Sequence, residues 1–209
     1  MVLIDKPPPS KPPNRLYCTL ASGRFLLRIF DPTSYGTQSL TFRTFGPINR
    51  FDHQQTSPNG NRTQDLERGI YYAGLTLSCC LVECFGDTGV IELKDQQICR
   101  IQLTRDLTLL DLKDNGAMRA GSVAALAKVA DRSLSQAWSR YFYEQASLYG
   151  QIDGISFRNA HNDEEAIALY ERAQSALFCP DTQIMRLDHP SLRPAIQQAA
   201  LDNHLDFPP

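Results

Sequence analysis

The chain has 209 residues, which is enough to bury one sizeable core and too few for two comfortable domains. Its charged fraction of 21% and net charge of −2 show no basic excess, which argues against non-specific nucleic-acid binding. No apolar run reaches membrane-spanning length, and the first residues carry an acid and prolines where a signal peptide needs an apolar core. We therefore expect a cytoplasmic protein that contacts neither nucleic acid nor membrane directly.

The six cysteines and four histidines form no recognisable framework. The cysteines lack CxxC spacing, and three of them (Cys79, Cys80 and Cys84) fall in one apolar segment, where a free thiol behaves as a small hydrophobic group. Neither a disulfide framework nor a zinc site follows from this pattern. We expect no metal site.

The first third of the chain is predicted to contain two strands and a long loop. Residues 1–15 include five prolines and are expected to form a flexible or polyproline-like lead-in to a single domain over 16–209. Residues 24–30 and 39–45 have strand-like patterns, and the polar segment 47–68 reads as an irregular loop. Loops of this length in compact domains are often functional.

The central stretch, residues 69–85, predicts a strand that ends at Gly74 and a helix over 75–85. This helix is apolar almost all round, so we expect it to be buried, yet it carries Glu83. A buried carboxylate is costly without a cation or strong donors. Glu83 is therefore interpreted as a structural partner of an arginine, as part of an exposed last turn, or as part of a site with arginines and tyrosines.

The second half of the chain is predicted to alternate between strands and helices. Its patterns indicate strands over 90–93, 98–103, 107–110 and 152–157, and helices over 117–129, 134–146 and 191–202. Residues 166–172 fit either a helix or a strand, and their apolar run after a polar loop favours a strand. A polar turn, residues 158–163, follows the strand at 152–157.

Several common kinds of active site are excluded by their missing motifs. The sequence has no GxGxxG, no GxxxxGK[ST], no GxSxG and no HExxH. The remaining set is arginines, tyrosines, a glutamate and the polar turn after a strand. This set suits an anionic substrate attacked at a sugar carbon, because arginine forks bind phosphates and a carboxylate stabilises oxocarbenium charge.

These residues resemble the motifs of the RES domain family. That family has LxR in an early strand, a [GN]RF[ND] loop, a YxA or YYA strand leading into a helix that ends in Glu, and a late DGxxYxS strand-turn. The matching residues are Leu26-Leu27-Arg28, Asn49-Arg50-Phe51-Asp52, Tyr71-Tyr72-Ala73, Glu83 and Asp153-Gly154-Ile155-Ser156-Phe157-Arg158-Asn159. The resemblance covers roughly residues 24–175.

The resemblance implies an α+β fold similar to that of the ADP-ribosyltransferase toxins, with a central mixed or antiparallel sheet flanked by helices. It implies NAD as a substrate, without a separate cofactor, degraded by phosphorolysis or hydrolysis. ADP-ribosylation of a protein and a catalytically silent nucleotide-binding module are the alternatives. A third alternative is a structural Glu–Arg core whose function lies in a partner-binding surface. Many family members are toxins paired with an Xre-type antitoxin, and a homodimer stays open.

By this resemblance, Glu83 and Arg28 are the catalytic candidates and Arg50 is a candidate for binding the NAD pyrophosphate. The family serine is replaced by Asn159, with Ser156 nearby, and both are candidate binding residues. Tyr71 and Tyr72 both fit the motif tyrosine, but strand alternation allows only one of them to face the site.

Overall fold

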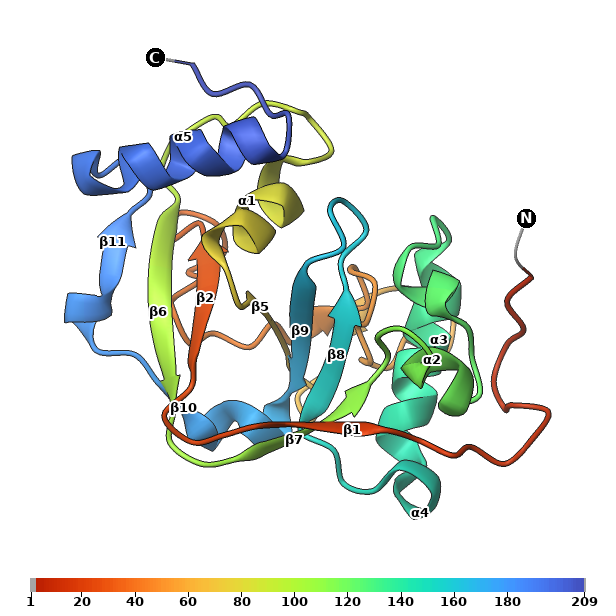
Figure 1. Cartoon of the computed structure of the whole chain (residues 1–209). Coiled ribbons are helices and arrows are strands. Elements are labelled where there is room, and N and C mark those ends of the chain that lie inside the picture. Colours follow the sequence, from red (N-terminus) through yellow and green to blue (C-terminus); the bar gives the residue numbers. More distant parts are fainter. Residues whose placement is uncertain (1–2, 209) are drawn as a thin grey trace.

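A nine-stranded mixed sheet forms the centre of the computed structural model, which describes residues 3–208 (Figure 1). Its strands follow the order β1-β7-β8-β9-β5-β2-β6-β10, and β11 also pairs with β6. The parallel pair is β7 with β8, and the other pairs are antiparallel. The strands are β1 (Tyr17–Leu20), β2 (Phe25–Phe30), β5 (Ile70–Gly74), β6 (Gln97–Leu103), β7 (Leu107–Asp111), β8 (Gly154–Arg158), β9 (Glu165–Tyr170), β10 (Leu177–Phe178) and β11 (Ile184–Arg186).

The sheet opens between β2 and β5. These neighbours share a single register pair, Leu27 with Gly74, whereas β2 and β6 pair along six residues. Figure 1 shows β2 and β6 diverging from β5, β9 and β8. A cavity forms at this break.

The helices lie in two groups around the sheet (Figure 1). α1 (Leu77–Phe85) contacts β2, β5 and α5 (Arg193–Asp202), while α3 (Arg132–Glu144) packs its buried aromatics against the other half of the sheet. The short elements are α2 (Gly116–Arg119), α4 (Ala146–Tyr149), β3 (Phe45–Gly46), β4 (Thr63–Gln64) and 3₁₀ turns at Ala124–Ala127, Glu171–Ala176, Asp181–Gln183 and Pro190–Leu192. None of the helices over 3–208 has both the length and the apolar character needed to cross a bilayer.

Most of the predicted elements are confirmed, and three are wrong. Within the predicted strand at 39–45, only Arg43, which bridges to Ile70, and Phe45, which begins β3, are paired, and the Thr41 carbonyl accepts a hydrogen bond from the Arg28 side chain. The predicted strand at 90–93 is reduced to a bridge between Val90 and Asp206. The predicted helix at 117–129 breaks into α2 and a 3₁₀ turn because Gly121 takes a left-handed φ of +91°.

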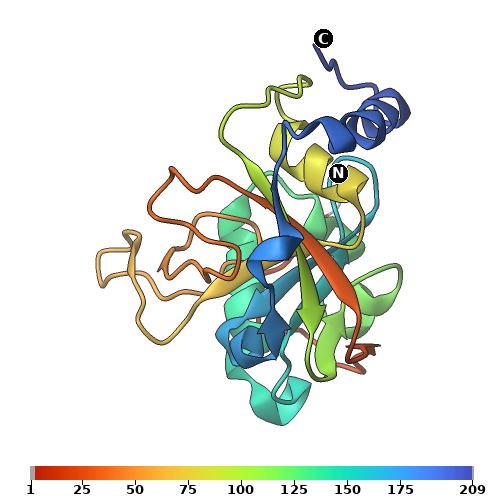
Figure 2. The ribbon, with the colours of Figure 1, turned by 90° about the vertical axis from the view of Figure 1, so that its left-hand side faces the viewer.

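The proline-rich lead-in lies against the helices, from residue 3 onward; residues 1, 2 and 209 fall outside the described part of the chain. Ile4 packs on the core, and the Trp138 indole donates a 2.8 Å hydrogen bond to the Asp5 carbonyl. The backbone N–H of Asn14 donates to the Arg119 carbonyl. Figure 2 shows a second feature, the segment between β2 and β5 (orange to gold), projecting from one side of the molecule.

A buried histidine ties this projecting segment to the core. His53 is fully buried, its Nε2 lies 3.1 Å from Glu171 Oε2, and its ring packs against those of Tyr143 and Tyr170. Burial lowers the pKa of His53 below its ordinary value of 6.5. The folded state therefore binds fewer protons here than the unfolded chain does.

We expect acid to destabilise the protein through His53. Its contribution to stability is present above the unfolded pKa of about 6.5 and is lost as the pH falls through the lower folded-state pKa. Urea unfolding between pH 7 and pH 5 measures this loss. In a His53→Gln variant the slope of the unfolding free energy against pH should become shallower. Equal slopes for parent and variant would show that other groups cause the acid sensitivity.

Candidate active site

The break between β2 and β5 holds a cavity of about 350 Å³ under α1, which we call the β2–β5 cavity. Strands β2, β5, β8 and β9 form its floor, α1 forms one wall, and the segment around Arg50 forms the other. The charged and polar residues on its wall are Arg28, Asn49, Arg50, Tyr72, Glu83, Asp87, Arg132 and His161. Its size is within the range of small-molecule sites.

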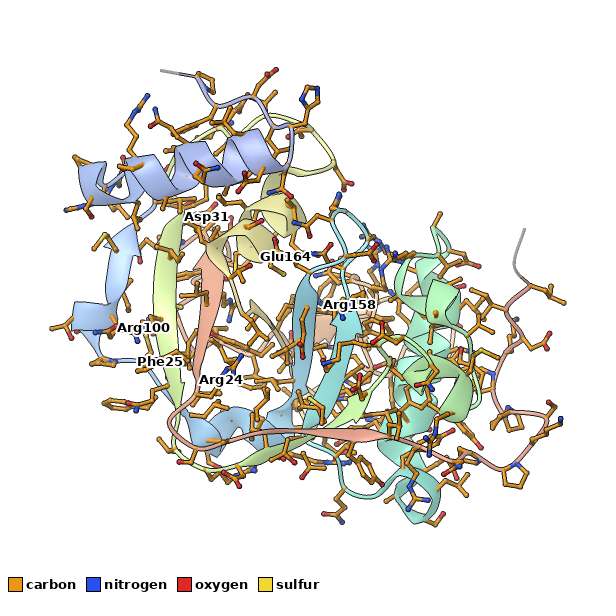
Figure 3. All side chains as sticks on the ribbon, viewed as in Figure 1. Arg24, Phe25, Asp31, Arg100, Arg158 and Glu164 are labelled. Carbon is orange, nitrogen blue, oxygen red and sulfur yellow. The ribbon has the colours of Figure 1, made fainter. Side chains whose placement is uncertain are left out.

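Helix α1 carries Glu83 into this cavity. The helix starts after Thr76, whose hydroxyl accepts a 3.0 Å hydrogen bond from the Cys79 N–H. Its start is also tied to the β8–β9 hairpin, because Glu164 accepts hydrogen bonds from the Thr76 and Ser78 hydroxyls (Figure 3). Leu81 and Phe85 pack towards α5, which leaves Glu83 open to solvent. The expectation that Glu83 is buried is therefore wrong: in the last turn Glu83 is exposed, while Val82 and Phe85 are buried.

Partial loss of hydration controls the charge of Glu83. Although water reaches the carboxylate, the surrounding cavity wall displaces enough of its hydration to raise the pKa, and His161 and Arg50 oppose this rise. No cation in the described residues lies within 4.0 Å of the carboxylate. The interpretation of Glu83 as one half of a structural Glu–Arg ion pair is thus not supported.

Arg28 is held by contacts on its own side of the cavity. Its Nη1 donates a 2.8 Å hydrogen bond to the Thr41 carbonyl, and its guanidinium lies 4.2 Å from the centre of the Tyr71 ring. Tyr71 is in turn fixed by a 2.6 Å hydrogen bond from its hydroxyl to the Ser39 carbonyl. The Arg28 side chain is therefore oriented before any ligand arrives, with only part of its donor set used.

Arg50 lies on a loop organised by a buried carboxylate, Asp52. The two Asp52 oxygens accept hydrogen bonds from Arg43 Nη2 (2.8 and 2.7 Å), the Asn49 N–H (2.8 Å) and the Tyr72 hydroxyl (2.9 Å). Arg50 itself donates to the Val129 carbonyl, and burial lowers its pKa. Its charge is still present at neutral pH because arginine pKa values start above 12.

The structure places Tyr72 and not Tyr71 at the cavity. The two side chains point to opposite faces of β5, as strand alternation requires. Tyr72 lines the cavity, and its hydroxyl is occupied by Asp52 and by the Phe51 N–H. The Tyr72 ring is therefore the part that can contact a ligand. Tyr71 instead stacks its ring against the Arg28 guanidinium.

Two other candidates from the sequence lie outside the cavity wall. Ser156 points away from the side of β8 on which Phe157 lines the cavity, and its hydroxyl donates to Glu165 Oε1 (2.7 Å). Asn159 is fully buried in the turn after β8, where its Oδ1 accepts from the backbone N–H groups of His161 (3.0 Å) and Asn162 (2.9 Å). Asn159 thus shapes the turn that carries His161.

We expect Asn159→Ala to destabilise the protein by about 2 kcal/mol, because two backbone N–H groups lose their acceptor. Asn159→Ser keeps a short side chain with an acceptor oxygen for the turn and should cost less. Urea unfolding of the two variants gives the comparison. Equal losses would mean that the turn does not depend on the Oδ1 acceptor.

Three residues of the cavity wall were not expected from the sequence: Asp87, Arg132 and His161. His161 lies in the polar turn after β8, so the turn was a signal, but a single histidine there gave no reason to choose it. Its ring packs over Gly86 at the end of α1, where an added Cβ would lie 2.5 Å from Nδ1. Arg132 opens α3, far along the chain, and no local pattern connects it with Glu83.

The cavity wall also carries cysteines. Burial raises the pKa of the Cys79 thiol to about 12, so this thiol is protonated at neutral pH and is a poor nucleophile. Among residues 3–208, no group of three or more His, Cys, Asp or Glu side chains is placed to hold a metal ion. Apart from its thiols and Tyr72, the ionisable groups on the cavity wall are carboxylates, arginines and a histidine.

The protein is thus an α+β protein with a cavity at the break in its mixed sheet, lined by a glutamate and arginines. The RES domain family model matches residues 28–190, which is more than half of the chain. The chain therefore belongs to the RES domain family.

A sequence match and a fold match were also found. The chain is 28% identical over 85 residues to "Probable toxin y4kH" of Sinorhizobium fredii; the match covers 41% of this chain and 65% of that protein, just under two thirds of its length. Its fold is also similar to a chain in the crystal structure of the M. tuberculosis MbcT–MbcA toxin–antitoxin complex. That match has a TM-score of 0.55 and 14% identity, and it covers 86% of this chain and 92% of the other. The predicted α+β fold, with a mixed sheet flanked by helices, is confirmed.

Proposed function

We propose that the protein consumes NAD by cleaving the bond between nicotinamide and ribose. The observation that carries this proposal is Glu83, a carboxylate of raised pKa in an open cavity that also contains Arg28 and Arg50. A carboxylate without a direct cationic partner is free to stabilise positive charge on a substrate. The two arginines supply donors for the phosphates that such a substrate carries.

In this mechanism, Glu83 accepts a hydrogen bond from a hydroxyl of the nicotinamide ribose. As the C–N bond breaks, its electron pair leaves with nicotinamide, which becomes neutral, and the ribose carbon acquires oxocarbenium character. The nearby negative charge stabilises that carbon, more strongly in the cavity than it would in bulk water. An oxygen of the acceptor then forms the new bond to the same carbon. Water gives ADP-ribose and a proton, and phosphate gives ADP-ribose with a phosphate ester at that carbon.

We assign Arg50 and Arg28 to the pyrophosphate, with the Tyr72 ring as a flat surface beside the bound nucleotide. An Arg50→Lys variant keeps the charge but loses the planar fork that meets two phosphate oxygens at once. We expect NAD to bind about tenfold more weakly, measured by calorimetry in a Glu83→Gln background that prevents turnover. An unchanged affinity would remove Arg50 from the pyrophosphate site.

The molecule that accepts the ADP-ribosyl group can be identified by following NAD and its products by NMR, with and without inorganic phosphate. Consumption that requires phosphate indicates phosphorolysis, and consumption without it indicates hydrolysis. Consumption only in the presence of a protein acceptor indicates ADP-ribosylation. Binding without consumption would establish the silent nucleotide-binding alternative and overturn the cleavage proposal. If NAD is neither bound nor consumed, NAD is not the ligand, and a function in a partner-binding surface remains.

We further propose that the protein acts as the toxin of a toxin–antitoxin pair with an Xre-type antitoxin. Support comes from the name of one relative and from the shared fold with a chain of a toxin–antitoxin complex. Expression of the parent chain in a bacterial host should deplete NAD and stop growth, and Glu83→Gln should do neither. Growth arrest by both proteins would separate toxicity from NAD cleavage.

A further inference from the structure

A second cavity, about 480 Å³ in volume, lies on the far side of the segment that carries Arg50. We call it the arginine cavity, because Arg62, Arg132 and Arg140 line it. Pro47 and Ile48 belong to its wall, whereas Asn49 and Arg50 belong to the wall of the β2–β5 cavity. Segment 47–50 therefore separates the two cavities, and Arg132 lines both.

The three arginines of this cavity have no anionic partner within the described chain. None of them forms an ion pair there. Nη1 of Arg140 is buried without a hydrogen-bond partner among residues 3–208. The acid one turn further along α3, Glu144, is already bound to Arg68 at 2.7 Å. Because no carboxylate in the described part of the chain neutralises the three guanidinium groups that line the cavity, these groups can bind an incoming anion.

The only acid among the lining residues is already engaged. Asp131 caps α3, and its Oδ1 accepts hydrogen bonds from the N–H (2.9 Å) and the hydroxyl (2.6 Å) of Ser133. These hydrogen bonds leave the charge of Asp131 in place, but three guanidinium groups outnumber one carboxylate, so the lining carries a net positive charge. Planar guanidinium forks suit a tetrahedral oxyanion with several acceptor oxygens.

We propose that the arginine cavity binds a phosphate group. The same chemistry has two sources, free inorganic phosphate and a phosphate carried by a nucleotide such as NADP. The proposal stands on this cavity and does not require cleavage of NAD. It does connect the two cavities, because Gln136 in the arginine cavity donates a 2.9 Å hydrogen bond to the Asn49 carbonyl. An anion held by the cavity therefore stabilises the segment that places Arg50.

The first experiment titrates inorganic phosphate into the protein by calorimetry at constant ionic strength, without any nucleotide. Arg62→Gln and Arg140→Gln should each weaken binding at least tenfold. The matched control is Arg24→Gln, which removes an equal charge from an exposed site outside both cavities (Figure 3). Circular dichroism confirms that each variant is folded. Arg62 is exposed on a loop, so its variant remains informative even if Arg140→Gln unfolds.

The second experiment separates the two sources in a Glu83→Gln background. A gain in affinity for NADP over NAD that Arg62→Gln abolishes would identify a nucleotide phosphate as the ligand. Phosphate binding that depends on Arg62, with equal affinities for NADP and NAD, would identify the free ion. If Arg62→Gln and Arg24→Gln behave alike with inorganic phosphate and with NADP, the proposal is overturned. These are binding measurements, so failure of NAD cleavage would leave their outcome unaffected.

Discussion

Replacing Glu83 with glutamine is expected to lower the rate of NAD cleavage by about two to three orders of magnitude, on the scale of one lost electrostatic contact. Glutamine has the size of glutamate and retains a carbonyl oxygen for the ribose hydroxyl, so NAD should still bind. Glutamine lacks the negative charge that stabilises the oxocarbenium ion. Single-turnover measurement of nicotinamide release gives the rate, and calorimetry gives the affinity.

The stability of the same variant provides the control. The folded-state pKa of Glu83 is raised, so the folded protein binds more protons than the unfolded chain between the two pKa values. The ionised carboxylate therefore costs stability once the pH rises above its ordinary value of 4.5. Glu83→Gln should be at least as stable as the parent at pH 7, and the difference should vanish at low pH. A destabilised variant would identify Glu83 as a structural residue.

The raised pKa also sets the pH dependence of the reaction. Only ionised Glu83 can stabilise the oxocarbenium ion, so the rate should fall as the pH drops through the folded-state pKa, which lies above 4.5. This acid limb should be absent from the residual activity of Glu83→Gln. A rate profile with the same acid limb in both proteins would assign the titrating group to another residue.

The sequence predicted the strongly periodic elements because their patterns are local. The strand that became β2, the strand and helix around Gly74, and the long helix α3 all follow from alternation, helical length and one glycine. The strand at 39–45 failed because an alternating pattern does not reveal a competing acceptor use, here the Arg28 bond to the Thr41 carbonyl. That hydrogen bond comes from a side chain thirteen residues away, which a local pattern does not reveal.

The same division between local and long-range information holds for the site. Glu83, Arg28 and Arg50 were found from motif positions, and the structure brings all three to one cavity. Arg132 could not be found, because α3 reaches the cavity only through the packing of the whole sheet. Asn159 was chosen by its position in the motif, yet it is buried and its amide oxygen accepts a hydrogen bond from the backbone of the turn. The motif position identified the right segment, but only the structure showed which side chains line the cavity and which stabilise the turn.

Asp52 is expected to show the largest effect on stability outside the core. Asp52→Asn leaves one acceptor oxygen for donors from Arg43, Asn49 and Tyr72, and it places an NH₂ group against some of them. Removing one partner of a buried charge pair costs about 3–5 kcal/mol. We expect the lower end, about 3 kcal/mol, because the Arg43 side chain is 28% exposed and water can replace part of the lost bond. Urea unfolding measures the loss.

A second buried carboxylate, Asp153, provides a control that distinguishes a loss of stability from a loss of activity. Asp153 is nearly as buried and also accepts from an arginine (Arg105, 2.7 Å) and a backbone N–H (Thr108, 2.9 Å), but it lies outside the β2–β5 cavity. Asp153→Asn should therefore destabilise the protein and leave kcat/KM unchanged at temperatures where it is folded. Asp52→Asn should lower kcat/KM under the same conditions, because the loop that places Arg50 has lost its anchor.

The Tyr72 hydroxyl tests whether Asp52 acts through this network. Tyr72→Phe removes one donor to Asp52 and the acceptor for the Phe51 N–H, which should cost about 1 kcal/mol. Because the two side chains share a hydrogen bond, the double variant should lose less stability than the two single variants added together. Additive losses, or an Asp52→Asn protein that keeps the parent kcat/KM, would show that the Arg50 loop is positioned without Asp52. A non-additive loss in stability accompanied by a fall in kcat/KM would establish Asp52 as the residue that couples the fold to the site.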